Sequence, residues 1–174
     1  MLETWDLVDS SRKPIGKQHV RGNDTLAGEY HIVVEIITLN ADGRILLTQR
    51  DAQKTHPLLW EGTGGSVTAG ESSIIGAVRE LEEETGLRAM PDELHLLGEI
   101  QGGNYFMDSY VWKSRQPIDP DALKLQAGEV CAAKLASWRE LERMNQQGLI
   151  VPSVWKRLGI YYNQIASFAK EAAK

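Results

Sequence analysis

A glycine-rich stretch followed at once by a segment of helical periodicity is the feature that most restricts how this chain can fold. Glycines cluster within residues 62–70, and residues 72–84 place apolar side chains at helical spacing. These side chains are Ile74, Ile75, Val78 and Leu81. Gly86 follows directly as a helix stop. The pattern predicts a loop that leads into one helix, with a single apolar face packed against a core.

Three glutamates, Glu80, Glu83 and Glu84, lie close together on this predicted helix. Offsets of three and four residues make side chains neighbours on a helix surface. Like charges at that spacing repel by roughly a few tenths of a kcal/mol per pair in water and by more in a cleft, so we expect a positive partner. Hard carboxylate oxygens favour Mg²⁺ or Mn²⁺. An ordinary solvated acidic helix surface is the alternative that these three residues leave open.

The residues around these glutamates resemble the Nudix box. Gly65, Glu71 and the segment Arg-Glu-Leu-Glu-Glu-Glu-Thr-Gly-Leu at 79–87 occupy every defined position of that box. In a chain of average composition such a match arises by chance with a probability on the order of one in 10⁷. The elements predicted before and after the box follow the order that the Nudix family has.

The resemblance implies an α/β fold, a Nudix-type α/β/α sandwich around a mixed β-sheet. Chain length and the lack of a linker predict a single domain over residues 1–174. The elements that the residues themselves predict fit this fold. They are an N-terminal β-hairpin (4–8 and 15–21), a hairpin around Asp42-Gly43 (30–39 and 44–49), strands at 94–101, 104–112 and 130–136, a helix at 137–146 and a C-terminal helix at 152–172.

The resemblance also implies roles for single residues. Glu83 and Glu84 match metal ligands of the family, and Glu80 matches a position that binds metal or serves as general base. Glu71 and Arg79 look like the pair in which the guanidinium ties the loop to the helix and orients the neighbouring carboxylate, so Arg79 joins Glu80 among the catalytic candidates. The reaction implied is hydrolysis of a pyrophosphate bond, in which metal ions neutralise the diphosphate and activate water while a carboxylate accepts the proton.

Two residues outside these positions complete the expected metal site. Gly64 directly precedes the box, where a backbone carbonyl often joins the metal shell. Glu129 is a candidate for the additional acid that many Nudix hydrolases bring from another loop. A solvated loop glutamate is the equally weighted alternative for Glu129.

Segments outside the box resemble the Nudix subgroup that is similar to type I isopentenyl-diphosphate isomerase. Arg50 and Lys54 fall where the isomerase holds its substrate's diphosphate, with solvated loop cations as the alternative. His31 falls where the isomerase has a metal ligand, although a lone histidine at the start of a strand is more often structural. The aromatic residues Tyr105, Phe106 and Trp155 are expected in the core rather than in a base pocket.

One departure separates this chain from the isomerase. The isomerase carries a catalytic cysteine shortly after the tryptophan that corresponds to Trp60, whereas the only cysteine of this chain is Cys131, which we expect to be buried in a strand. The box is also complete, so hydrolysis of a nucleoside diphosphate or related nucleotide derivative is favoured. Isomerisation of isopentenyl diphosphate and non-catalytic nucleotide binding remain the alternatives, and the sequence does not name the substrate.

Composition and net charge restrict the kinds of partner that the protein is expected to bind. The net charge of −5, from 19 Lys and Arg against 24 Asp and Glu, provides no basic field for nucleic acid. No apolar run approaches the roughly 20 residues of a membrane span, and the acidic start and lone cysteine favour the cytoplasm. The expected partner is a small-molecule diphosphate, and the sequence leaves open whether the chain forms a homodimer.

Overall fold

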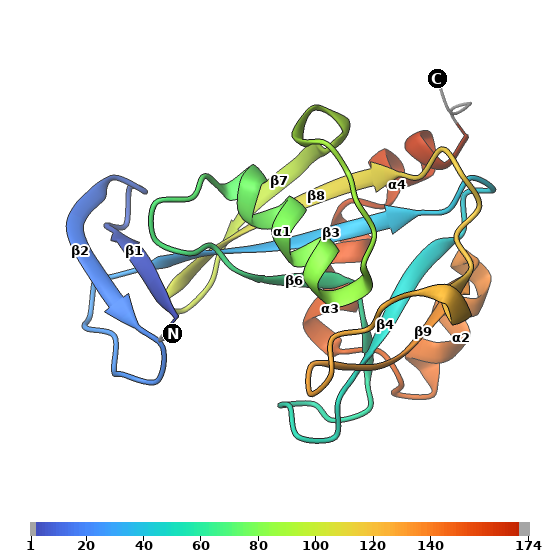
Figure 1. The fold of residues 1–174 in the computed structure, drawn as a ribbon, viewed down its shortest axis with the longest axis horizontal. Coiled ribbons are helices and arrows are strands. Elements are labelled where there is room, and N and C mark those ends of the chain that lie inside the picture. The colour runs from blue at the N-terminus through green and yellow to red at the C-terminus, as the bar shows by residue number, and fades with distance from the viewer. Residues whose placement is uncertain (1–2, 171–174) are drawn as a thin grey trace.

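The computed structural model describes residues 3–170 as a mixed sheet with helices on both sides and a separate hairpin at one end (Figure 1). Two short 3₁₀ turns lie at Pro91–Glu93 and Pro120–Ala122. The strands are β1 (Thr4–Val8), β2 (Pro14–Val20), β3 (His31–Leu39), β4 (Ile45–Arg50), β5 (Trp60–Glu61), β6 (Thr63–Ser66), β7 (His95–Gln101), β8 (Tyr105–Lys113) and β9 (Val130–Ala136). The helices are α1 (Ser73–Thr85), α2 (Trp138–Gln146), α3 (Pro152–Ile160) and α4 (Tyr162–Lys170).

Strand β3 organises the sheet. It runs parallel to β8 along its whole length, and β8 pairs antiparallel with β7. Its other edge pairs antiparallel with β6 near its start, from Val33 to Ile36, and meets β4 only at Leu39, opposite Ile45. The expected turn is present at Gly43, whose φ is 85°. The expected hairpin is present, since β3 and β4 pair antiparallel across this turn. The pairing is short, because β6 occupies the edge of β3 and β4 pairs mainly with β9 and β5.

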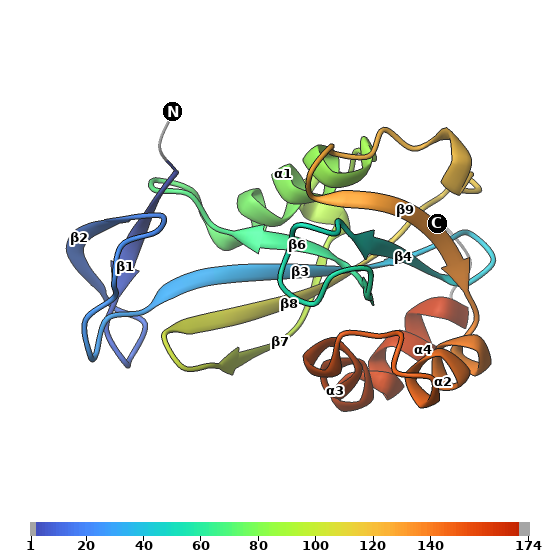
Figure 2. The ribbon, with the colours of Figure 1, turned by 90° about the horizontal axis from the view of Figure 1, so that it is seen from below.

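Two cores form on the two faces of this sheet (Figure 2). On one face, Val34 and Ile36 of β3 pack with Leu81 of α1. On the other, Ile37 and Leu39 pack with α2, α3 and α4. Because successive side chains of a strand point to opposite faces, one apolar strand supplies both cores. The mixed sheet between helical layers confirms the predicted α/β fold class.

The C-terminal helix is the second element that departs from prediction. It consists of α3 and α4, separated at Tyr161, where φ is −97° and ψ is 8°. The Tyr161 ring lies over Gly98 of β7, where a Cβ would be 2.9 Å from the phenol oxygen. Apolar side chains of both helices nevertheless face the core, since Val154, Leu158 and Ile165 are all buried. The last predicted residues, 171–172, lie outside the described part of the chain.

The predicted N-terminal hairpin is present as β1 and β2 and is attached to the sheet at several points. The Ala69 amide donates to the carbonyl of Thr4 at 2.8 Å, and the Gly70 amide donates to the carboxylate of Asp6 at 2.7 Å. Val8 also pairs with Tyr30, just before β3. The hairpin therefore lies directly against the loop that precedes α1.

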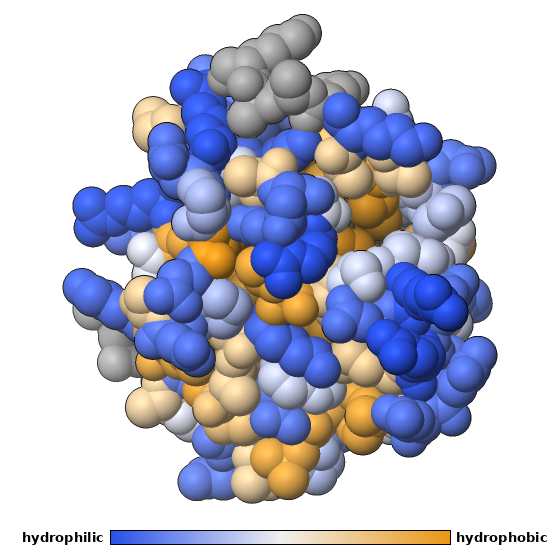
Figure 3. Space-filling model, turned by 90° about the vertical axis from the view of Figure 1, so that its right-hand side faces the viewer, coloured by the Kyte–Doolittle hydropathy of each residue, from blue (hydrophilic) through white to orange (hydrophobic). Residues whose placement is uncertain are grey.

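The molecular surface is largely polar. The face in Figure 3 is mostly hydrophilic, with apolar side chains in small groups between charged ones. Within residues 3–170, no helix is long and apolar enough to cross a membrane. Cys131 contributes to the surface, contrary to expectation, because β9 turns Val130 inward and the next residue outward.

Candidate active site

Helix α1 and its preceding loop form as the sequence predicts. The helix begins after Ser72 and ends at Gly86, whose φ of 75° provides the left-handed conformation of a helix C-cap. Leu81 is fully buried and fixes which side of the helix faces the sheet. The three glutamates of the box then lie along the edge between the core and solvent, with Glu80 and Glu84 buried and Glu83 exposed.

A cavity of about 380 Å³, which we call the box cavity, opens beside α1. The loop before α1 supplies part of one wall with Gly64, Gly65, Ser66 and Thr68, and α1 supplies the rest of that wall with Arg79, Glu80, Glu83 and Glu84. The hairpin supplies a second wall with Glu3, Trp5 and Arg21, and the remaining lining consists of Lys54, Gln126 and Glu129.

Arg79 connects the loop to the helix. Its Nε donates to Glu71 at 2.9 Å, and one terminal nitrogen donates to the carbonyl of Ser66, also at 2.9 Å. The other terminal nitrogen contacts Glu80 at 2.8 Å and Glu83 at 3.1 Å. A planar guanidinium is suited to this work because its donors are fixed in direction. The geometry agrees with the positioning role that the resemblance implied for Arg79.

The electrostatics of the cavity wall are dominated by buried carboxylates. The pKa of Glu84 is raised to about 8, mainly by burial and also by the nearby Glu80 and Glu61, with Lys54 and the Gly64 amide acting in the opposite direction. Burial also raises the pKa of Glu80, opposed by Arg79. Two partly uncompensated carboxyl groups in contact with a cavity create a strong preference for a cation.

Two glycines leave these carboxylates room. A Cβ on Gly65 would lie 2.4 Å from the Glu80 carboxylate, and a Cβ on Gly64 would lie 2.2 Å from the carbonyl oxygen of Val34. Neither position tolerates a side chain without moving backbone or carboxylate. Gly65 therefore leaves room for the Glu80 carboxylate beside β6, and Gly64 lets β6 pack closely against β3. The Gly64 amide donates to Glu84 at 3.1 Å.

The donor set fits a divalent cation such as Mg²⁺, since it consists of hard oxygens and its carboxylates lack full charge compensation. Within residues 3–170, no three acidic, histidine or cysteine side chains converge as ready metal ligands. The reason is that Arg79 holds Glu80 and Glu83, and Glu84 accepts from Gly64. Binding a cation requires these carboxylates to exchange protein partners for the ion.

The structure separates the two predicted phosphate-binding cations. Lys54 lines the box cavity and forms an ion pair with Glu129, which also lines it. Arg50 is not part of that lining. Its guanidinium binds Glu61 at 2.6 Å and both the carbonyl and the hydroxyl of Thr55. Lys54, Glu129 and the box glutamates are therefore brought together, whereas Arg50 anchors the loop that carries Lys54.

His31 also lies away from the box cavity. It is buried at the start of β3, and its ring stacks on Trp5 with centroids 4.5 Å apart. Burial lowers its pKa, and its Nδ1 has no hydrogen-bond partner among the described residues. This arrangement agrees with the structural interpretation of His31. Of the three aromatic residues expected in the core, Phe106 is buried, whereas Tyr105 and Trp155 are only half-buried.

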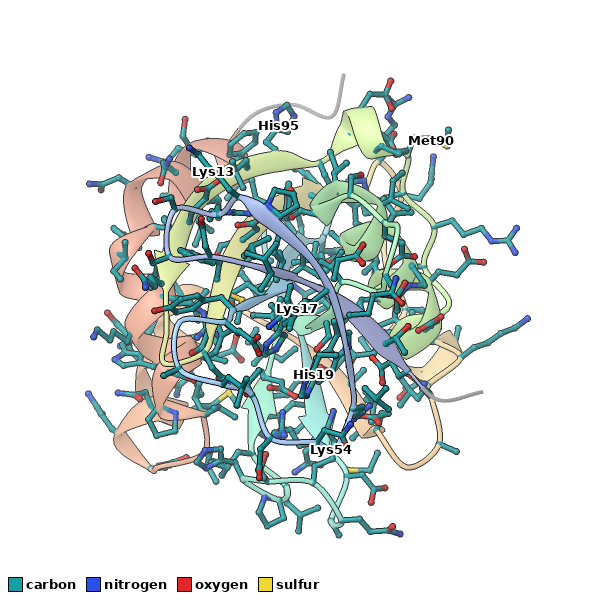
Figure 4. The ribbon with its side chains drawn as sticks, turned by 90° about the vertical axis from the view of Figure 1, so that its left-hand side faces the viewer. Lys13, Lys17, His19, Lys54, Met90 and His95 are labelled. Atoms are coloured by element: carbon teal, nitrogen blue, oxygen red, sulfur yellow. The ribbon has the colours of Figure 1, made fainter. Side chains whose placement is uncertain are left out.

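The hairpin contributes cavity residues that sequence reasoning missed. Trp5 and Arg21 line the box cavity, and Arg21 pairs with Glu3 at 2.7 Å. Figure 4 looks onto the hairpin, with Lys17 and His19 on β2 and Lys54 beyond one end of it. No local pattern could have placed these side chains, because the position of the hairpin depends on contacts with distant strands.

The comparisons with known proteins agree with this geometry. Residues 29–153 match the family model of the NUDIX domain. An uncharacterized Nudix hydrolase of Listeria monocytogenes is 31% identical over 157 residues, covering 87% of this chain and 89% of the relative. An isopentenyl-diphosphate Delta-isomerase of Nocardia farcinica is 36% identical over 86 residues, covering 48% of this chain and 49% of the relative.

The fold has a counterpart among solved structures. A crystal structure from Deinococcus radiodurans superposes with a TM-score of 0.67 at 20% identity, covering 86% of this chain and 92% of the other. The family model covers most of the chain, and the box residues stand in one cavity wall. The chain belongs to the Nudix hydrolase family.

Proposed function

We propose that this protein is a Mg²⁺-dependent pyrophosphohydrolase that cleaves the diphosphate linkage of a nucleoside diphosphate or a related nucleotide derivative. The observation that carries the proposal is the pair of buried carboxylates, Glu80 and Glu84, in the wall of a cavity that also contains Lys54 and Arg21. Buried negative charge beside cations suits a site that takes a metal ion and a phosphate anion together.

Each box residue has a role in this proposal. Glu83, Glu84 and the Gly64 carbonyl hold the cation, and Glu80 either joins them or accepts the proton of the attacking water. The cation supplies charge neutralisation of the diphosphate and a more acidic water. The raised pKa of Glu80, caused by burial, makes it a stronger base than an exposed glutamate. Arg79 positions Glu80 through their 2.8 Å ion pair.

The residues opposite the box bind the substrate. Lys54 leaves its ion pair with Glu129 and binds an oxygen of the diphosphate. Glu129 then faces the cavity as the additional acid. Arg50 supports this loop from behind through Glu61 and Thr55. We further propose that residues 1–174 act as one domain, because the hairpin lies outside the family match at 29–153 and still lines the same cavity.

The isomerase-like subgroup assignment rests on the flanking segments and on one partial match to an isomerase. Isomerisation itself is the weaker candidate. It demands a positioned acid opposite a base, and the loop after Trp60 has no cysteine. Cys131 is exposed on β9 and is not part of the box cavity lining.

A substrate screen tests the proposal. The purified protein is incubated with nucleoside diphosphates, nucleotide sugars and isopentenyl diphosphate, each with Mg²⁺, with Mn²⁺ or with a chelator, and products are identified by mass. We expect metal-dependent release of a phosphate-containing product from at least one nucleotide. Formation of dimethylallyl diphosphate would favour the isomerase, and binding of nucleotides without any turnover would favour a non-catalytic module.

A further inference from the structure

A second cavity lies on the other side of β6 from the box cavity. Its volume is about 250 Å³, and it shares Gly64, Gly65 and Ser66 with the box cavity. These shared residues form a narrow ridge, since two of the three have no side chain. A molecule whose diphosphate lies in the box cavity can therefore extend over β6 into the second cavity.

The second cavity has a charged floor. Arg157 of α3 forms an ion pair with Glu35 of β3 at 2.7 Å, and the two side chains are only 12% and 9% exposed. Ser109 of β8 donates to the other oxygen of Glu35 at 2.6 Å. The Nε of Arg157 is buried with no hydrogen-bond partner among the described residues. The guanidinium thus retains one N–H donor, at Nε, that no described residue accepts from.

The walls of this cavity combine apolar and aromatic surface. Val33, Tyr105 and Met107 line it from β3 and β8, and all three are only half-buried. Figure 2 shows α2, α3 and α4 gathered under one end of the sheet, so the end where β3 begins has no helix over that face. An aromatic ring and a polarizable thioether beside a polar floor suit a flat ligand with a hydrogen-bonding edge.

The charged floor is not explained by stability alone. Replacing a buried ion pair with apolar side chains of similar size is often neutral or stabilising, because desolvation costs offset the attraction. The neighbouring positions along β3, Ile37 and Leu39, achieve helix packing with apolar side chains. An ion pair with an unused donor beside a cavity is more useful for recognising a ligand.

We propose that the second cavity is the subsite for the part of the substrate beyond the diphosphate, and that Glu35 and Arg157 make it select a planar group with hydrogen-bonding edges, of the nucleobase kind, over an isoprenyl chain. This inference rests on the proposed function. The substrate lies across β6, with phosphates against α1 and the planar group between Tyr105, Met107 and the ion pair.

Binding of non-hydrolysable probes tests the inference without requiring turnover. The probes are methylenediphosphonate, the α,β-methylene diphosphates of adenosine, guanosine, cytidine and uridine, and methylenediphosphonate carrying an isopentenyl chain. Calorimetric titration in Mg²⁺ should show at least one nucleoside probe binding tenfold or more tightly than bare methylenediphosphonate, and the isopentenyl probe binding no more tightly than the bare one.

Three variants test whether the nucleoside part of the probe binds in the second cavity. Met107→Trp should fill the second cavity and abolish the advantage of the nucleoside probe, while bare methylenediphosphonate binds as in the wild type. Gln101→Trp, on the neighbouring strand β7 and outside the cavity lining, is the matched control and should change neither. The double variant Glu35→Leu with Arg157→Met removes both charges together, and it should reverse the preference toward the isopentenyl probe.

The outcomes separate the two proposals. Failure of bare methylenediphosphonate to bind in Mg²⁺ would count against the proposed function itself. Binding of that probe without any nucleoside advantage, or an advantage that survives Met107→Trp, would overturn the subsite alone. An isopentenyl probe preferred by the wild type would overturn the assignment of a polar ligand.

Discussion

Arg12, in the turn between β1 and β2, donates two hydrogen bonds, at 2.7 and 2.9 Å, to the carboxylate of Asp108 in β8. The two residues are 96 positions apart in the sequence. Asp108 is buried, and it also accepts a hydrogen bond from Ser73 at the start of α1. A single carboxylate thus joins the hairpin, the sheet and the box helix. The contact fastens to the sheet the hairpin that carries Trp5 and Arg21 of the box cavity.

Removal of the Arg12 side chain should destabilise the protein and loosen the hairpin. Arg12→Ala leaves the buried Asp108 without its counter-ion, so we expect a loss of at least about 2 kcal/mol in the free energy of unfolding. Urea denaturation measures this loss. Arg115→Ala is the control, since Arg115 pairs with Glu93 at the surface and should cost less than about 1 kcal/mol. Equal stabilities of the two variants would contradict the anchoring role of Arg12.

Two glutamates on the same helix should differ sharply in their effect on turnover. Glu84→Gln removes a buried carboxylate of the box cavity, and we expect turnover to fall by at least about 10²-fold with the fold intact. Glu82→Gln is the matched control, because Glu82 is exposed, pairs with Arg88 and does not line the box cavity. It should retain activity near that of the wild type. Steady-state kinetics on one accepted substrate, with circular dichroism for the fold, compares them.

The parts of the site that could be predicted are those with local contacts. Glu71 and Arg79 are 8 positions apart and meet across one loop and two helical turns, so the resemblance to the Nudix box is enough to indicate the pair. The order of glutamates on α1 follows from helix periodicity in the same way. Such contacts need only the local conformation to be correct.

The parts that could not be predicted depend on which strands become neighbours. Arg50 binds Glu61 because β4 pairs with β5. No turn in the sequence indicates that β9 and β5 pair with β4 beyond its short pairing with β3. The ion pair between Glu35 and Arg157 likewise joins β3 to α3, two elements that are far apart in the sequence. The C-terminal helix is interrupted at Tyr161, whose ring packs against Gly98, again a residue that is distant in the sequence. Tertiary packing overrides local pattern at each of these positions.

Lys54 and Arg50 should give different defects although sequence comparison treats them alike. Lys54→Ala removes a cation from the box cavity, and loss of one charge-assisted contact of about 1.5–3 kcal/mol should raise KM by roughly 10-fold or more with little change in Tm. Arg50→Ala removes the partner of the half-buried Glu61 and should lower Tm more than Lys54→Ala does. Kinetics and thermal denaturation of both variants decide this. A Tm for Arg50→Ala equal to that of the wild type would contradict its anchoring role.

The stability of the metal-free protein should depend on pH through Glu84. Burial raises its pKa to about 8 in the folded state from an ordinary value of 4.5. The folded state therefore binds the proton more tightly than the unfolded state, so this contribution to stability is complete below about pH 4.5 and is lost as the pH rises through 8. In a chelator, we expect the free energy of unfolding to fall across this window, by roughly a few kcal/mol.

Two comparisons show whether Glu84 and the cation are responsible for this trend. Glu84→Gln carries no titratable group at this position, so its stability should vary less with pH than that of the wild type in the same chelator series. Millimolar Mg²⁺ should oppose the trend in the wild type, because a cation binds the ionised carboxylates of the folded state and gains affinity as protons leave. Denaturation series from pH 5 to 9, with chelator and with Mg²⁺, measure both effects. Parallel curves for the wild type and Glu84→Gln in chelator would show that another group sets the pH dependence.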